Sequence, residues 1–142
     1  MQHFTYPVVL TPDESDGGFV VTCRDLPEAI TQGNSIAEAI EQAEGALQAA
    51  IESRIEDGME LPIPSGPRKG EHSVHVPIST AMKAALYIAM REQGVSKSEL
   101  ARRLGLDEKE ARRMLNPRYA TKVAALERAL HALGKRVEVV VG

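Results

Sequence analysis

The chain has 142 residues, 43% of them hydrophobic, which is enough to bury one core or two small ones. Its single cysteine, Cys23, excludes an internal disulfide and fits a reducing compartment. No apolar run approaches the ~20 residues of a membrane span and the N-terminus lacks the pattern of a signal peptide, so we expect a cytoplasmic protein without a membrane partner. The net charge of −3 conceals an asymmetry, because residues 1–70 carry 4 basic and 12 acidic residues whereas residues 71–142 carry 13 basic and 8 acidic ones.

Residues 1–33 predict a hairpin and a short third strand. Apolar residues alternate over residues 3–11, which indicates a strand, and the turn-forming run 13–18 joins it to a second strand at 19–23. Residues 29–32 predict a third, shorter strand that ends at Gly33.

An amphipathic helix is predicted to follow. Ser35 and Glu38 have the spacing of a capping box, in which each residue satisfies an orphan backbone donor of the other. The helix places an apolar stripe on one side, formed by Ile36, Ile40, Ala43, Leu47, Ala50, Ile51 and Ile55. Its opposite face is acidic.

Residues 61–70, rich in proline and glycine, predict a connector, and residues 72–77 predict one more strand.

The basic half has the pattern of a small helical domain. Helices are predicted at 79–93, at 96–104, from Asp107 to about 115 and at about 122–133, followed by a terminal strand at 136–141. The overall prediction is an α+β chain in which a β-β-β-α-β domain precedes an all-α domain.

Residues 96–116 have the layout of a helix-turn-helix, with a glycine at the turn and small or apolar residues at the helix crossing. A recognition helix needs long donors, because base edges and phosphates in the major groove offer many acceptors. The candidate DNA-binding residues are Lys97, Ser98, Glu108, Lys109, Arg112, Arg113, Asn116, Arg118 and Lys122. Two alternatives are a helical bundle with a solvated basic face, and a ribbon-helix-helix built on the strand near Val74.

The apolar terminal strand would be unfavourable as an unpaired strand, because it would expose apolar side chains and unpaired backbone groups to water. Pairing with its copy in a second chain through Val137, Val139 and Val141 would cover it and would give the two-fold symmetry of a palindromic operator. Alternatively, it joins the sheet of its own domain.

The acidic half shows little sign of catalysis. Asp13, Glu14 and Asp16 lack the ordered acceptors of a calcium loop, and turn formation explains them better. His72 and His75 lie three residues apart on a predicted strand, so they would point to opposite faces. We expect no catalytic residue, metal or cofactor.

Several segments resemble the HicB antitoxin family in its helix-turn-helix subclass, namely 6–12 (YPVVLTP), 25–33 (DLPEAITQG) and 99–105 (ELARRLG). The resemblance implies a partial RNase H-like N-terminal domain that lacks the full catalytic carboxylate set. It also implies a HicA-type toxin partner, a small basic mRNA interferase whose active face the antitoxin would cover. The C-terminal domain would bind operator double-stranded DNA as a homodimer or as a tetramer. The acidic candidates for toxin contact are Asp13, Glu14, Asp16, Glu41, Glu44 and Glu52.

The prediction is therefore a toxin-binding domain at 1–66, a linker and connecting strand at 67–78, and a DNA-binding and dimerisation domain at 79–142. The expected function is an antitoxin of a type II toxin–antitoxin system that also represses its own operon. Two rivals are a free-standing transcriptional regulator with a ligand-sensing N-terminal domain and a degenerate RNase H-like nuclease.

Overall fold

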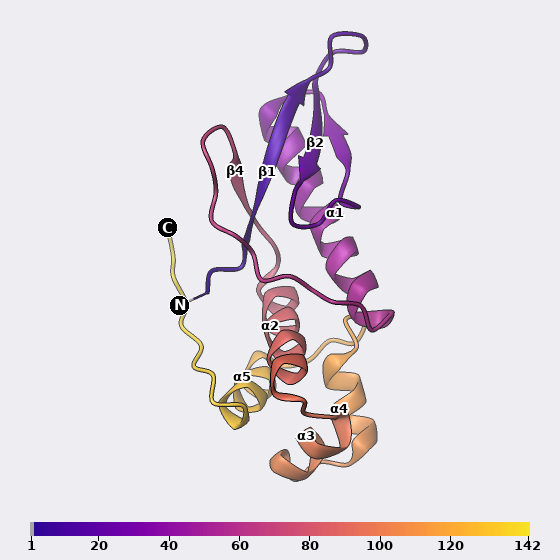
Figure 1. Cartoon of the computed structure of the whole chain (residues 1–142), viewed down its shortest axis with the longest axis vertical. Helices are drawn as coiled ribbons and strands as arrows, with labels where there is room; N and C mark the ends of the chain where they lie inside the picture. Colours follow the sequence, from indigo (N-terminus) through magenta and orange to yellow (C-terminus); the bar gives the residue numbers. More distant parts are fainter. Residues whose placement is uncertain (1) are drawn as a thin grey trace. The chain divides into compact units, whose positions relative to one another are not determined.

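The computed structural model describes residues 2–142, which form two compact units (Figure 1). The N-terminal unit comprises the described residues up to Arg54 together with Leu61–Pro77. The C-terminal unit comprises Ile55–Glu60 and Ile78–Gly142. Among the described residues, no helix has the length and apolar character needed to cross a membrane.

The N-terminal unit is built on an antiparallel sheet with the strand order β3-β2-β1-β4. The strands are β1 (Thr5–Pro12), β2 (Phe19–Cys23), β3 (Thr31–Gly33) and β4 (His72–His75). Val8 pairs with Cys23, and Tyr6 pairs with Val74, so these four side chains share one buried face of the sheet. The hairpin, the short third strand and the later strand predicted from the sequence are all present.

Helix α1 (Ile36–Glu56) lies along the sheet (Figure 1). The Ser35 hydroxyl accepts a hydrogen bond from the Glu38 backbone N–H at 3.1 Å, as the capping box predicts. The fully buried side chains of the helix recur at helical spacing and include Ala39, Ala43, Leu47, Ala50 and Ile51. Burial of each large aliphatic side chain contributes about 1.5–3 kcal/mol to the core.

The apolar stripe of α1 begins later than predicted. Ile36 was expected in the stripe, but it is 50% exposed, and Ala39 is the first fully buried residue of the helix. At Ala39, β3 approaches the helix closely. A Cβ atom at Gly33 would lie 2.4 Å from the backbone nitrogen of Ala39, so only glycine fits there.

The connector between α1 and β4 is fastened to the sheet by Arg24, which follows β2. Its guanidinium donates to both carboxylate oxygens of Glu71, at 2.9 and 3.0 Å, to the Ser65 hydroxyl, and to the Gly66 carbonyl at 2.7 Å. Asp25 accepts hydrogen bonds from the backbone N–H and the hydroxyl of Ser65. The predicted connector is thus irregular in backbone but held by specific polar contacts.

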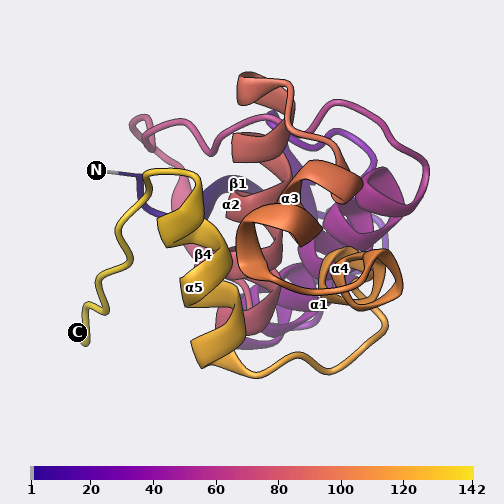
Figure 2. The same cartoon turned by 90° about the horizontal axis from the view of Figure 1, so that it is seen from below.

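The C-terminal unit contains four helices, as the sequence predicts. They are α2 (Ile78–Gln93), α3 (Lys97–Leu104), α4 (Glu108–Leu115) and α5 (Val123–Ala132). Helix α2 packs against α5 and α4, and α3 packs against α4 and α5 (Figure 2). Their shared core is aliphatic, and its fully buried members include Leu86, Leu100, Leu126 and Ala129.

The predicted terminal strand at 136–141 is not formed, and this is a correction. The backbone after Leu133 has no regular structure up to Gly142, and the described chain has no strand beyond β4. Val137 packs partly against the helical core, whereas Val139 is 69% exposed and Val141 is 89% exposed. A strand needs a hydrogen-bonded neighbour, and the single chain provides none for this segment. The alternative in which the segment joins its own domain's sheet is also wrong.

Candidate functional site

Helices α3 and α4 are joined by a tight turn whose geometry follows from three residues. Ser96 caps α3 by accepting from the Glu99 backbone N–H at 3.1 Å, and Asp107 caps α4 by accepting from the Glu110 N–H at 2.8 Å. Gly105 ends α3 in the left-handed conformation with φ of 67°. The glycine that the sequence predicts at this turn is confirmed.

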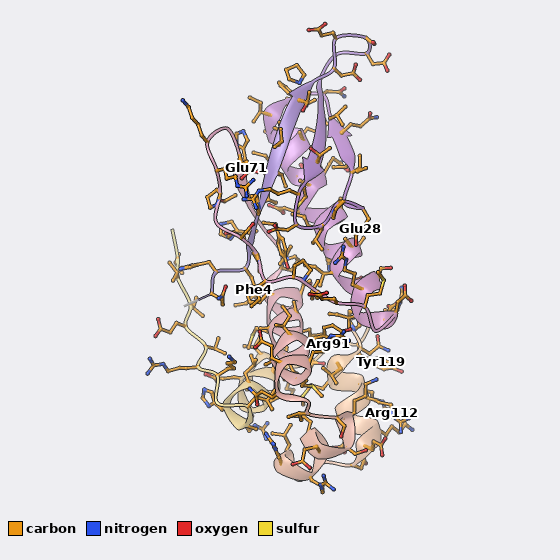
Figure 3. All side chains as sticks on the ribbon, in the orientation of Figure 1. Phe4, Glu28, Glu71, Arg91, Arg112 and Tyr119 are labelled. Carbon is orange, nitrogen blue, oxygen red and sulfur yellow. The ribbon has the colours of Figure 1, made fainter. Side chains whose placement is uncertain are left out.

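One side of this helix pair is buried and the other is polar. Leu100, Ala101, Ala111, Met114 and Leu115 lie in the core of the C-terminal unit. Most candidate DNA-binding side chains are exposed, namely Lys97, Ser98, Glu108, Lys109, Arg112, Arg113, Arg118 and Lys122. The structure therefore gathers the candidates of α4 on the solvent side of that helix, and Figure 3 shows Arg112 projecting from it.

Asn116 differs from the other candidates because its side chain is used within the loop that follows α4. It is only half-buried, and its Oδ1 atom accepts a hydrogen bond from the Arg118 backbone N–H at 2.9 Å. This contact shapes the loop as an Asx turn, so Asn116 has a local structural role.

The arginines of this surface have exposed intramolecular partners. Arg112 is 3.4 Å from the Glu108 carboxylate, and the Arg113 guanidinium lies 5.8 Å from the centre of the Tyr119 ring. Arg118 donates to Glu56 at 2.6 Å. Exposed ion pairs contribute only ~0–1 kcal/mol, so these cations can exchange such partners for phosphate at little cost.

The sequence did not reveal that Lys83 of α2 would be buried. It is only 3% exposed, and its ammonium donates to the carbonyls of Asn116 and Tyr119 at 2.6 and 2.5 Å. The available signal was its position, because Lys83 lies three residues before Leu86 and seven before Met90 on the apolar side of the helix. A lysine within an apolar stripe predicts a buried polar partner.

The acidic candidates lie on two separate segments of the N-terminal unit. Asp13, Glu14 and Asp16 lie in the β1–β2 hairpin loop, where the Asp13 carboxylate accepts from the backbone N–H groups of Ser15 and Asp16. Asp13 therefore builds the turn, as the sequence suggested.

On α1, Glu41 and Glu44 are exposed. Glu52 is half-buried and accepts a hydrogen bond from the Gln48 side chain at 3.1 Å. Arg54, the basic residue in the last turn of this helix, is paired with Glu28 at 2.5 Å, so its charge is compensated. The Arg54 hydrogen bond also lowers the pKa of Glu28. The exposed part of α1 therefore keeps its negative potential.

The other reactive side chains form no catalytic arrangement in the part of the chain that the structure describes. Burial raises the pKa of the Cys23 thiol, which keeps it protonated, and also raises the pKa of the Tyr6 phenol, whose buried hydroxyl has no protein partner there. His72 and His75 lie on the exposed edge strand β4. Residues 2–142 contain no group of three or more histidine, cysteine or acidic residues placed to hold a metal ion.

A family profile and several curated relatives point to one family. Residues 5–85 match a family profile described as the HicB-like antitoxin of bacterial toxin–antitoxin systems. A protein named antitoxin HicB from Escherichia coli is 42% identical over 135 residues, which cover 95% of this chain and 97% of the relative. Antitoxin HicB 2 from Photorhabdus laumondii is 40% identical, with 98% and 97% covered, and antitoxin HicB from Pseudomonas fluorescens is 31% identical, with 93% and 91% covered.

Proposed function

Because the chain belongs to the HicB-like antitoxin family, we propose that it neutralises a HicA-type mRNA interferase through its N-terminal unit and represses its own operon through a helix-turn-helix formed by α3 and α4. The family consists of antitoxins and not of enzymes, which agrees with the expectation that the chain has no catalytic activity.

The observation that carries the DNA-binding proposal is the row of exposed cations on α4. The helix is capped at Asp107, its apolar residues are buried, and Arg112 and Arg113 occupy its solvent side. An arginine fork can bind guanine edges or phosphate oxygens in the major groove. Ser98 and Lys97, at the N-terminus of α3, are suited to backbone phosphate. The repressor would work in the cytoplasm, where its operator is found.

The toxin-binding proposal rests on charge and on family. The first half of the chain has a net charge of −8, and the exposed carboxylates of α1 and of the hairpin loop form its candidate contact surface. A toxin that cleaves RNA binds phosphate, so a carboxylate surface can occupy the same cationic site. The element order β1-β2-β3-α1-β4 is the one expected for a partial RNase H-like domain.

The proposed assembly is a homodimer, or a tetramer formed from two dimers. The exposed valines of the C-terminal segment support it, because pairing with a second copy would remove Val139 and Val141 from water.

The decisive experiment for DNA binding compares two double variants that lose the same charge. Arg112→Ala with Arg113→Ala removes the proposed recognition side chains, and Arg128→Ala with Arg136→Ala removes two exposed arginines elsewhere in the C-terminal unit. We expect the first variant to weaken binding to the promoter duplex roughly 10- to 1000-fold at fixed salt, since each base contact is worth about 1–3 kcal/mol. The second should lose less than about fivefold. Equal losses would show that α4 is not the recognition helix.

Toxin neutralisation is tested by co-expression with the proposed partner, a small HicA-type toxin. Glu41→Gln with Glu44→Gln should reduce co-purification of that protein and restore its toxicity, while promoter binding stays unchanged. Glu127→Gln with Glu138→Gln, on the C-terminal unit, is the control with the same change in charge. A fully active Glu41/Glu44 variant would exclude the acidic face of α1 as the contact surface.

A further inference from the structure

Lys83 is the most deeply buried charged residue that the structure describes. It lies in α2, a helix that carries none of the candidate DNA-binding residues. Transfer of an ammonium out of water is unfavourable unless acceptors compensate it, so a lysine at such a position needs specific partners. Methionine or leucine would fill the same space without that requirement.

Two partners of Lys83 are backbone carbonyls at the end of α4 and in the loop that follows it. Its Nζ atom donates to the carbonyl of Asn116 at 2.6 Å and to the carbonyl of Tyr119 at 2.5 Å. Asn116 is the C-cap of α4, where the last carbonyls of a helix lack helical partners and carry the negative end of the helix dipole. The ammonium therefore compensates the C-terminus of this helix and satisfies two of the acceptors nearby.

The same contacts fix the loop formed by residues 116–119. The Asn116 side chain binds the Arg118 N–H, and the Tyr119 N–H donates to the Asn116 carbonyl at 3.1 Å. Lys83 closes the loop from its buried side, because its two acceptors are the first and last residues. On the exposed side, the loop carries Arg118 and the Tyr119 ring, against which Arg113 stacks.

We propose that Lys83 is a positioning residue for DNA recognition, which sets the placement of α4 and of the loop 116–119 without touching DNA itself. This inference rests on the proposed helix-turn-helix function. A side chain that is 3% exposed cannot reach a groove, so its effect passes through the Asn116 and Tyr119 carbonyls. Base readout depends on the angle and depth of the recognition helix, whereas attraction to phosphate depends mainly on net charge.

The test compares Lys83→Met with Lys135→Met in the full-length chain. Lys135 is exposed in the same unit, so both variants lose one positive charge. Fluorescence anisotropy at fixed salt measures binding to the promoter duplex and to an unrelated duplex of the same length. We expect Lys83→Met to lose on the order of tenfold in affinity for the promoter, similar to one mismatched base pair, and less than about twofold for the unrelated duplex. Lys135→Met should change both affinities by the same factor. Lys83→Arg should restore part of the wild-type ratio between the affinity for the promoter and the affinity for the unrelated duplex.

Equal losses of Lys83→Met on both duplexes, or no loss, would overturn the inference. Wild-type protein supplies a second measurement that does not depend on the folding of a variant. The Lys83 ammonium should give a ¹H–¹⁵N signal that is protected from solvent exchange, and an ammonium that exchanges as fast as Lys135 would also overturn it. If the wild type fails to prefer the promoter duplex, the proposed function itself fails while the ammonium signal remains protected.

Discussion

At the scale of single residues, Gly33 is a position at which a Cβ atom would meet backbone at 2.4 Å, as it would at Gly18. Substitution Gly33→Ala should destabilise the chain by about 1–3 kcal/mol, because its Cβ must displace the backbone of α1 near Ala39. Urea unfolding of the full chain measures this. Gly45→Ala is the matched control, since a Cβ there meets nothing within 4 Å and alanine favours the helix by about 0.5–1 kcal/mol. A neutral Gly33→Ala would contradict the close approach of β3 to α1.

Arg24 gives the stability of the chain a pH dependence with a defined sign. Its hydrogen bonds lower the pKa of Glu71 from the ordinary value of 4.5. A group whose pKa is lowered in the folded state contributes stability that is present above the unfolded-state value and is lost as pH falls through the folded-state value.

We therefore expect Arg24→Met to be less stable than the wild type at pH 7, with a difference that shrinks as the pH falls below about 4.5. Thermal unfolding between pH 3 and pH 7 measures the difference. Lys69→Met, an exposed residue of the same connector, should show no such pH-dependent difference. A constant difference for Arg24→Met would mean that the Glu71 contact does not form in solution.

At the scale of elements, two variants of Asp107 separate the effect of its capping hydrogen bond on α4 from the effect of its negative charge. Asp107→Ala removes the acceptor for the Glu110 N–H and should cost about 1 kcal/mol, whereas Asp107→Ser keeps an acceptor and should cost much less. Chemical denaturation of both variants checks the difference. If the two variants behaved alike, the cap would contribute little to this helix.

Most of the helices and strands could be predicted because their signals are local. Capping residues, turn glycines and apolar periodicity lie within a few residues of the structure that they specify, as Ser96, Gly105 and Asp107 illustrate. The strand predicted at 136–141 is not formed within the single chain, because apolar alternation indicates only that a segment is able to pair. A partner strand is also required, and the periodicity of one segment does not say whether it exists.

The site was only partly predictable for a related reason. The exposed cations of α4 followed from helical spacing, but contacts between distant segments did not. The pairing of Lys83 with Asn116 and of Arg118 with Glu56 joins residues 33 and 62 positions apart. The partner of a buried or paired charge is set by the tertiary fold, so only its existence could have been anticipated.

At the scale of the whole molecule, the proposed dimer predicts that substitutions in the C-terminal segment lower the mass of the protein in solution. Val139→Asp with Val141→Asp should convert a dimer to a monomer, because two charges would be buried at each copy of the segment. Analytical ultracentrifugation measures the mass, and Arg136→Ala with Glu138→Ala, which leaves the valines intact, is the control. An unchanged dimer in the aspartate variant would place the two-fold contact elsewhere.

Residues 55–60 belong to the C-terminal unit although they precede the connector, so a cut in the connector affects that unit. The Tyr87 hydroxyl donates to the Met59 carbonyl at 2.6 Å, and Arg91 donates to the Gly58 carbonyl at 3.1 Å, so the helical unit is supported by chain that precedes the connector. A protease that cuts the chain after Glu60 would break the covalent link between residues 55–60 and the helices that they contact. The same cut would divide the N-terminal unit, because β4 lies beyond Glu60 and pairs with β1. We therefore expect a single cut to weaken both of the proposed activities, promoter binding and toxin neutralisation.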